Sequence, residues 1–244
     1  MALLHKTLFV LVFPALTALV SAACLVLAGV GENARLAHAL VCAWARLSLF
    51  LAGVRLKADL ARLDPKATYV FMANHQSQFD ILILFAALSR YNLRFVAKEE
   101  LFKIPLFGRA MLKTGHIPIL RENSRKAMKS IDDAVAAAKR GICVLIFPEG
   151  TRSETCRRLG EFKIGGMIMA LKCGLPVAPV ILTGTGSILP RGAWLPTPGV
   201  TRLEALQPFD PSERFTIKQR EDFRLWLQEH MGKAYEERST CRTA

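Results

Sequence analysis

The feature that most constrains this chain is a run without charged residues at positions 7–31, close to the amino terminus. A helix needs roughly 20 consecutive apolar residues to cross the core of a bilayer. Lys6 in front of the run and the small residues Ala22 and Ala23 also suit a secretory signal peptide, but the run is long for a signal and stays apolar beyond them. We therefore predict a retained membrane helix rather than a cleaved signal.

A second apolar stretch, residues 36–54, follows the polar turn at 31–35. Within it or just before it, polar and polarisable residues recur at spacings of three and four, which puts them on one side of a helix: Arg35, His38, Cys42 and Arg46. Such a helix is expected to lie in the membrane interface or to pack on the rest of the protein. We expect a hairpin that enters the membrane from one side, with two full crossings as the alternative. Both arrangements place the basic remainder of the chain on the cytoplasmic face.

The net charge and the cysteine content limit which ligands and partners are expected for the chain. Its formal net charge is +13 at pH 7, which attracts anionic lipids, phosphorylated substrates and acidic proteins. The basic residues are scattered, no nucleic-acid motif occurs and the amino terminus is apolar, so we expect anionic membrane lipids as partners and no nucleic acid. The six cysteines show no C-x-x-C pair and no zinc spacing, which predicts reduced core residues and no metal site.

The remaining chain alternates between short β-prone runs and longer helical runs. Strands are predicted at 54–58, 68–73, 93–97, 116–120, 142–147, 176–183 and 200–207. Helices are predicted at 80–88, at 100–112 with a break at Pro105, and at 124–140, 162–173 and 216–235, with Gly141 and Gly174 ending two of them. This alternation predicts an α/β fold with a mixed, largely parallel sheet flanked by helices.

Reactive side chains and a glycine recur where predicted strands end. Each of these positions follows a different strand: His75, Lys98, Arg121, Glu149 and Gly184. The carboxyl ends of parallel strands meet at one edge of a sheet, where α/β folds bind their ligands. One histidine, one carboxylate and several cations are thus expected in one cleft, which suggests proton abstraction beside a bound anion.

The segment NHQSQFD, residues 74–80, has two interpretations. Ser77 followed three residues later by Asp80 resembles a capping box, in which the serine oxygen accepts from the third helical amide and the carboxylate reaches back. In the other interpretation, His75 is a base that is neutral near pH 7, and Asp80 holds its tautomer. The two are compatible, because a capped helix start would hold Asp80 beside His75.

The order of motifs along the chain resembles that of the glycerolipid acyltransferases, the family with an H-x-x-x-x-D signature that includes the 1-acylglycerol-3-phosphate acyltransferases. The resemblance extends over residues 55–210 and rests on NHQSQFD together with later landmarks: Lys98, Leu101, Pro105, Gly108, Gly115 through Arg121, FPEGTRS at 147–153, FKIGG at 162–166 and LPVAPV at 175–180. The ordered set is far more specific than any single motif. The chain departs from the family at Leu120, where many members carry an acidic residue.

The resemblance implies transfer of a fatty acyl group from a thioester of coenzyme A or acyl carrier protein to a lipid hydroxyl, without a resident cofactor. The expected acceptor is lysophosphatidate, and the product is phosphatidate. It also implies a glycerol-3-phosphate acyltransferase-like fold with a membrane hairpin at 1–54, a catalytic domain at 55–235 and a polar tail at 236–244. Three alternatives remain open: another lysolipid acceptor such as a lyso-ornithine lipid, a thioesterase that uses water, and a non-catalytic lipid carrier.

Residue roles follow by matching positions to the family motifs. His75 is expected to act as the general base and Asp80 to orient it, with no covalent intermediate. Substrate contacts are expected from the flanking positions: Asn74, Ser77, Lys98, Arg121, Glu149, Gly150, Thr151 and Arg152. Among these, the cations suit a phosphate, and amides near Gly150 suit an oxyanion hole. Glu149 has three possible roles: a hydrogen bond to an acceptor hydroxyl, a contact that holds Arg152, or a structural role. His116 and His230 are predicted to be structural or exposed.

Overall fold

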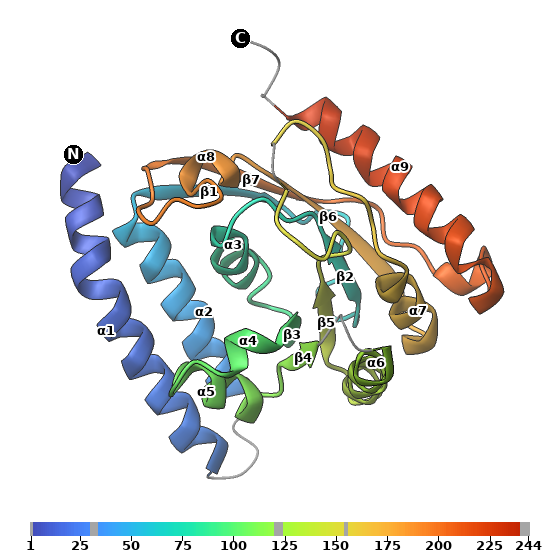
Figure 1. Cartoon of the computed structure of the whole chain (residues 1–244), viewed down its shortest axis with the longest axis horizontal. Helices are drawn as coiled ribbons and strands as arrows, with labels where there is room; N and C mark the ends of the chain where they lie inside the picture. Colours follow the sequence, from blue (N-terminus) through green and yellow to red (C-terminus); the bar gives the residue numbers. More distant parts are fainter. Residues whose placement is uncertain (1, 30–33, 120–123, 154–155, 240–244) are drawn as a thin grey trace.

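The structure, a computed structural model, describes residues 2–29, 34–119, 124–153 and 156–239, and its arrangement is shown in Figure 1. Within these residues the strands form one sheet in the order β1-β7-β6-β2-β5-β3-β4. Strands β2 to β6 run in one direction, whereas β7 is antiparallel to β6 and parallel to β1. The predicted mixed, largely parallel sheet is confirmed. The strands are β1 Val54–Asp59, β2 Val70–Ala73, β3 Leu93–Lys98, β4 Ile117–Ile119, β5 Cys143–Ile146, β6 Val177–Thr183 and β7 Gly199–Ala205.

The central strands are apolar throughout because both faces of the sheet are covered. Every residue of β2, β5 and β6 is buried, as expected of parallel strands between two layers of helices. Successive side chains of a strand point to opposite faces. Phe71 and Leu145 accordingly enter one core, whereas Val70 and Val144 enter the other.

Helices cover both faces of the sheet (Figure 1). On one side lie α2 Ala34–Leu51 and α3 Phe79–Ala87, and on the other α6 Ser124–Lys139, α7 Ile164–Cys173 and α9 Arg220–Arg238. The shorter elements are α4 Glu99–Phe102, α5 Phe107–Lys113, α8 Thr185–Ile188 and 3₁₀ turns at 211–213 and 217–219.

Several helix boundaries follow the predicted glycines and prolines. Gly141 lies two positions after the end of α6 and Gly174 directly after α7, with positive φ of 71° and 62°. This is the left-handed conformation that ends many helices. The chain breaks around Pro105 between α4 and α5, as predicted. The strand predicted at 200–207 is present as β7 and lies between β1 and β6. One expectation needs correction: α9 continues to Arg238, so the first residues assigned to the polar tail are helical.

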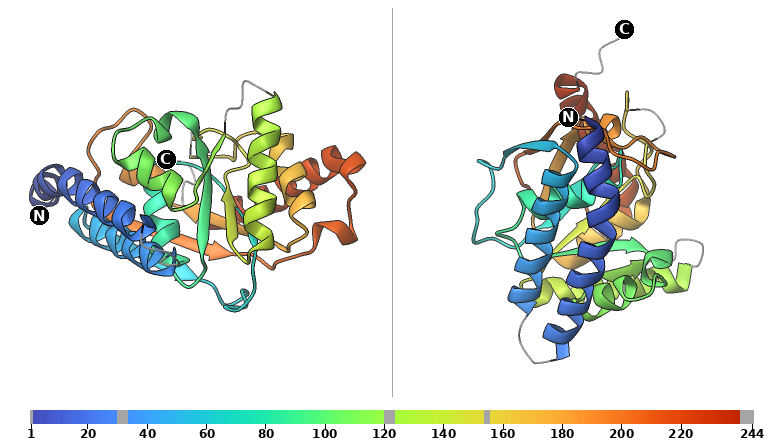
Figure 2. Two further views of the ribbon diagram at one scale, coloured as in Figure 1. Left: turned by 90° about the horizontal axis from the view of Figure 1, so that it is seen from below. Right: turned by 90° about the vertical axis from the view of Figure 1, so that its left-hand side faces the viewer.

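The amino-terminal helices form an antiparallel pair against the sheet domain (Figure 2). Helix α1, Ala2–Gly29, is long and apolar enough to cross a membrane. Only 17% of the residues in its most apolar stretch are buried. It packs along α2 and on α5, while α2 packs on α3 and β1. The expectation that the second apolar stretch packs on the rest of the protein is thereby confirmed, and the hairpin's insertion from one side stays a prediction.

Helix α2 has two different faces. His38, Cys42 and Leu49 are buried toward the domain. Leu36, Leu47 and Phe50 are 54%, 43% and 73% exposed, and their spacings of eleven and three residues align them along the opposite face. We call these three residues the α2 stripe. It joins the exposed apolar side chains of α1 into a surface that suits lipid.

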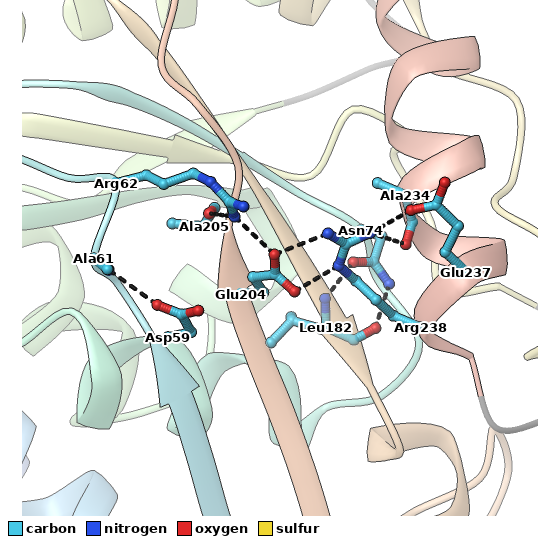
Figure 3. Close-up of polar contacts among 10 residues, drawn as sticks. All are labelled: Asp59, Ala61, Arg62, Asn74, Leu182, Glu204, Ala205, Ala234, Glu237 and Arg238. Atoms are coloured by element: carbon cyan, nitrogen blue, oxygen red, sulfur yellow. Dashed lines mark hydrogen bonds and ion pairs between the residues drawn. The ribbon is translucent and has the colours of Figure 1, made fainter.

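A carboxylate on β7 ties the carboxyl-terminal helix to the sheet (Figure 3). Glu204 accepts from Arg238 of α9 at 2.5 and 2.8 Å and from Arg62 of the β1–β2 loop at 2.8 Å. The hydrogen bonds from Arg238, and then from Arg62, lower the pKa of Glu204 to about 2. One partly buried carboxylate thus links three segments that are far apart in the sequence.

Replacing Glu204 with glutamine should weaken this link. We expect the free energy of unfolding to fall by about 1–3 kcal/mol near neutral pH, because both guanidinium groups lose a charged acceptor. The folded-state pKa lies below the ordinary carboxyl value of about 4.3. The contribution of the charge is therefore fully present above that value and is lost as the pH falls toward 2. Urea unfolding of both forms at neutral and acid pH measures this difference.

Glu236→Gln, at an exposed position of α9, is the matched control. We expect it to change the free energy of unfolding by less than about 0.5 kcal/mol. Equal stabilities for the two variants near neutral pH would contradict the proposed link.

Candidate active site

The segments that follow β2, β5 and β6 meet at one edge of the sheet. The amide of Ser153 donates to the carbonyl of His75 at 2.7 Å, and Thr185 Oγ1 donates to Gln76 Oε1 at 3.3 Å. The predicted convergence of the strand ends is therefore observed for His75, for the 149–153 segment and for the turn after Gly184. Lys98 ends β3 at the same edge, but its 61% exposed side chain pairs with Glu100 at 3.3 Å. Arg121 lies outside the described residues.

His75 and Asp80 form a hydrogen-bonded pair at this edge. Asp80 Oδ2 lies 2.7 Å from His75 Nδ1, and the Asp80 side chain is fully buried. With a carboxylate at that distance, Nδ1 carries the proton and donates it, and Nε2 is left as the basic nitrogen. The imidazole is 16% exposed, so Nε2 can be reached by a substrate. The spacing of five residues thus brings the two groups together, as predicted.

Backbone amides hold the Asp80 carboxylate in place. Its Oδ2 also accepts from the amides of Gln76 at 2.7 Å and Ser77 at 2.9 Å. Among the described residues, Oδ1 is buried without a partner. Three donors thus converge on one carboxylate oxygen and fix the position of Asp80 beside His75.

The capping-box prediction is correct for the carboxylate and wrong for the serine. Asp80 reaches back to the Ser77 amide, as the motif requires. Ser77 Oγ, however, accepts from the amide of Phe79 at 3.2 Å instead of that of Asp80, and it donates to the carbonyl of Leu189 at 2.9 Å. The hydroxyl is therefore shared between the start of α3, at Phe79, and a neighbouring loop.

Glu149 braces the backbone on both sides of the site. Its Oε1 accepts from the His75 amide at 2.7 Å and its Oε2 from the Gly160 amide at 2.6 Å. It is 2% exposed, and burial raises its pKa. A β-carbon at Gly160 would lie 2.7 Å from Oε2, so this close approach requires glycine. No hydrogen bond or ion pair to Arg152 occurs within the described chain, and the contacts favour the structural role.

The ring of His75 is held by a neighbour that the motif reasoning overlooked. Phe147, the first residue of FPEGTRS, stacks on the imidazole with centroids 3.9 Å apart and planes 13° from parallel. Together with Asp80, this stacking restricts rotation of the ring. An aromatic residue at the start of the motif was the available signal in the sequence.

Two residues assigned to substrate contact are instead engaged with the backbone. Asn74 is fully buried, and its amide donates to and accepts from the backbone of Leu182 on β6 at 2.9 and 2.7 Å (Figure 3). Ser77 is likewise buried against Leu189. Both positions tie the loop at 74–78, which we call the catalytic loop after the role predicted for His75, to β6 and its following turn. Direct contact of these two side chains with substrate stays a prediction that their geometry does not favour.

The EGTR segment turns outward at Gly150. Gly150 has φ of 73°, and its amide donates to the carbonyl of Phe147 at 3.0 Å, which removes that amide from the expected oxyanion hole. Thr151 is exposed and Arg152 is partly exposed. Arg152 makes no hydrogen bond or ion pair within the described chain, so its guanidinium is available to an anion at the site edge.

A buried polar chain connects α9 to the catalytic loop. Gln76 Nε2 donates to the hydroxyl of Tyr235, which donates to the carbonyl of Cys156 at 2.6 Å. The Thr185 hydroxyl donates to the oxygen of the Gln76 side-chain amide. Gln76 and Tyr235 are 3% and 1% exposed. Because 159 positions separate them, no local pattern indicates this contact.

An apolar cavity lies beside the site, between the hairpin and the sheet domain. It has an empty volume of about 630 Å³, part of which is open to solvent. Its walls come from α1, α2, α3, β3, α4 and α5, and include Thr17, Trp44, Ile81, Phe85, Phe95 and Met111. Phe95 is also a neighbour of Phe147, with centroids 6.2 Å apart, which brings this wall close to His75. Periodicity could not reveal the cavity, because six separate elements line it.

Two other histidines, His116 and His230, differ from His75 in their surroundings. His116 Nδ1 accepts from the amide of Phe95 at 3.0 Å, and burial lowers its pKa to about 3. His230 stacks on Trp226, with centroids 5.1 Å apart. No hydrogen bond to a carboxylate is present at either ring in the described structure, in line with the predicted structural roles.

Comparison with known proteins identifies the family of this domain. The sequence model of the family named Acyltransferase matches residues 55–183, which include His75, Asp80 and the EGTR segment.

The chain belongs to the acyltransferase family.

Named relatives support this assignment. A 1-acyl-sn-glycerol-3-phosphate acyltransferase of Helicobacter pylori is 31% identical over 76% of the chain and 75% of that protein. One from Pseudomonas aeruginosa is 33% identical over 66% of the chain and 63% of that protein. A chloroplastic one from Brassica napus is 36% identical over 64% of the chain and 45% of that protein. The chain spans less than half the length of the relatives from Brassica napus, Chlamydomonas reinhardtii, Arabidopsis thaliana and Cocos nucifera.

The fold of the acyltransferase also has a counterpart among solved structures. The crystal structure of the 1-acyl-sn-glycerophosphate acyltransferase PlsC from Thermotoga maritima superposes with a TM-score of 0.79 and 23% identity, covering 98% of this chain and 97% of that one. The likeness includes the amino-terminal helices, since nearly the whole chain is covered. The predicted fold class is confirmed.

Tyr235 lies outside the matched family domain, and we expect it to position the catalytic loop. Tyr235→Phe removes the hydroxyl that bridges Gln76 and Cys156. The Gln76 side chain anchors a residue whose backbone amide holds Asp80. We therefore expect kcat for acyl transfer to fall about tenfold, equivalent to about 1.4 kcal/mol, with a smaller change in KM. Steady-state kinetics on the purified variant measures both.

Tyr69→Phe is the matched control. The Tyr69 hydroxyl accepts from the amide of Asp64 at 3.0 Å, and both residues precede β2, whereas His75 follows it. It should cost similar stability and leave kcat within about twofold. Equal losses of kcat in both variants would mean that Tyr235 contributes only to folding.

Proposed function

We propose that this acyltransferase transfers a fatty acyl group from a thioester to the sn-2 hydroxyl of 1-acylglycerol-3-phosphate, giving phosphatidate for phospholipid synthesis. The observation that carries the proposal is the 2.7 Å contact between His75 Nδ1 and the buried Asp80 carboxylate, within the family domain. The names of the relatives from bacteria and plants support the choice of acceptor.

The chemistry requires a base because an alcohol is a weak nucleophile at neutral pH. In the proposed mechanism, Nε2 of His75 accepts the proton of the acceptor hydroxyl as its oxygen bonds to the thioester carbonyl carbon. Asp80 stabilises the resulting imidazolium. The tetrahedral intermediate then expels the thiolate as the carbon–sulfur bond breaks, and the imidazolium returns the proton to sulfur. The acyl group passes directly between substrates without a covalent enzyme intermediate.

The surroundings of His75 offer one site for the fatty acyl chain and another for the acceptor phosphate. The apolar cavity suits a fatty acyl chain, because its walls are almost entirely apolar. Arg152 and Lys98 are the described cations at the site edge, and Arg121 follows β4 in the sequence. We assign the acceptor phosphate to this group of cations. The acyl donor, coenzyme A or acyl carrier protein, acts as a co-substrate.

The exposed apolar faces of the hairpin support a membrane location. Helix α1 and the α2 stripe present large apolar side chains to the outside, and the net charge of +13 favours an anionic membrane surface. We place the catalytic domain on the cytoplasmic face, where both the acyl donor and anionic lipids are met. A lysolipid acceptor would then reach the site from the bilayer.

His75→Ala should abolish the proposed chemistry while leaving the fold intact. We expect kcat to fall by at least about 10²–10⁴-fold, which is the usual contribution of a general base. His230→Ala, a histidine outside the site, is the matched control and should retain activity within about threefold. Transfer of labelled acyl groups, followed by lipid chromatography, measures both. Activity of His75→Ala within a fewfold of the unaltered protein would exclude His75 as the base.

A panel of acceptors tests the proposed substrate. We expect lysophosphatidate to be preferred over lysophosphatidylcholine and lyso-ornithine lipid, because a phosphate monoester offers the most charge to the cations at the site edge. The measurement is kcat/KM for each acceptor with one acyl thioester. A preference for another lysolipid would change the acceptor, free fatty acid without any acceptor would indicate a thioesterase, and no turnover would favour a lipid carrier.

A further inference from the structure

A second pocket lies at the opposite edge of the sheet from His75. It forms where β2, β3 and β5 begin, beside the first turns of α2, and has an empty volume of about 910 Å³. The strands that separate the two edges are four to six residues long. At roughly 3.3 Å per residue, they place this pocket about 13–20 Å from the catalytic edge. We call it the basal pocket.

Three cations line the basal pocket without acidic partners. Arg35 comes from α2, Lys66 from the loop before β2 and Arg90 from the loop before β3. All three are exposed and form no ion pair within the described chain. The lining residues include no aspartate or glutamate. Asp64, the nearest acid to Lys66 in the sequence, turns its carboxylate to the Lys66 amide at 2.9 Å.

The rest of the lining offers neutral hydrogen-bonding groups. Thr68, Ser89 and Asn92 contribute hydroxyl and amide groups, and His38 forms part of the wall. Burial lowers the pKa of His38 to about 4, so this ring is neutral near pH 7. The positive potential of the pocket therefore comes from three fixed cations in a concave surface, an arrangement that concentrates anions.

The position of the pocket indicates what kind of anion it meets. Arg35 directly precedes Leu36, the first member of the α2 stripe, which is 54% exposed. The α2 stripe continues through Leu47 to Phe50 along the helix. A cationic pocket at the end of an exposed apolar stripe matches a molecule with an anionic head and apolar tails. A free anion would use the pocket but would gain nothing from the stripe.

We propose that the basal pocket binds the headgroup of an anionic phospholipid, whose acyl tails lie along the α2 stripe. This site is separate from the acceptor site at His75, and the proposal does not depend on the reaction that the enzyme catalyses. A lipid held there fixes the orientation of the domain on the bilayer through one specific contact, in addition to the general attraction of a basic protein to an acidic surface.

The test compares two triple variants of equal charge. Arg35→Gln/Lys66→Gln/Arg90→Gln removes the pocket cations, and Lys218→Gln/Arg220→Gln/Lys233→Gln removes three exposed cations around α9, on the other side of the molecule (Figure 1). Binding of the full chain to vesicles of phosphatidylcholine with phosphatidylglycerol is measured by flotation. Each cation near the surface contributes about 1 kcal/mol, so the pocket variant should bind about 100-fold more weakly. The control should change less than about threefold, because its charges are screened over a Debye length of about 8 Å.

Further binding measurements distinguish a bound phospholipid from a free anion and from general charge attraction. On vesicles of phosphatidylcholine alone, the pocket variant and the unaltered protein should bind alike. Soluble short-chain phosphatidylglycerol should bind the unaltered protein saturably and compete better than inorganic phosphate. Arg90→Gln alone should weaken vesicle binding about fivefold, which keeps the test informative if the triple variant unfolds. Equal losses in the two triple variants, or equal competition by inorganic phosphate, would overturn the proposal.

Discussion

The buried carboxylate of Asp80 is the group on which the rest of the site depends. Burying an ionised carboxylate costs several kcal/mol unless hydrogen bonds compensate it. Here one oxygen accepts from His75 and from the amides of Gln76 and Ser77, and bonds to a charged group contribute about 1.5–3 kcal/mol each. The loop must therefore curl around the carboxylate for the fold to tolerate it. That curl is also what presents the imidazole of His75 to the cleft.

Much of this arrangement could be predicted from the sequence because it follows from local patterns. The apolar runs of β2, β5 and β6 are continuous, as buried parallel strands require. Once the strands were placed, the position of His75 and Glu149 at one edge followed from topology. The pairing of His75 with Asp80 was accessible because five residues of loop and first helical turn can bend back on themselves.

Contacts between segments far apart in the sequence could not be predicted from local patterns. Glu149 looked like a substrate ligand from its motif. Its two oxygens instead accept from the backbone amides of His75, 74 positions earlier, and of Gly160, 11 positions later. Asn74 bonds a strand 108 positions later, and Tyr235 reaches Gln76 across 159 positions. No periodicity encodes which distant backbone a polar side chain will meet. Conversely, the sequence could not distinguish a buried brace from an exposed binding group of the same residue type.

The walls of the apolar cavity belong to two parts of the molecule with different environments. Thr17 and Trp44 stand on helices whose outer faces suit lipid, whereas Ile81 and Phe95 stand on the core of the sheet domain. Any displacement of α1 or α2 relative to α3 alters the width of this cavity. In the proposed membrane location, the thickness and lateral pressure of the bilayer would act directly on those two helices. In the proposed function, the range of acyl chain lengths that fits would then depend on both the protein and its membrane, because six of the sixteen residues that line the cavity belong to the hairpin.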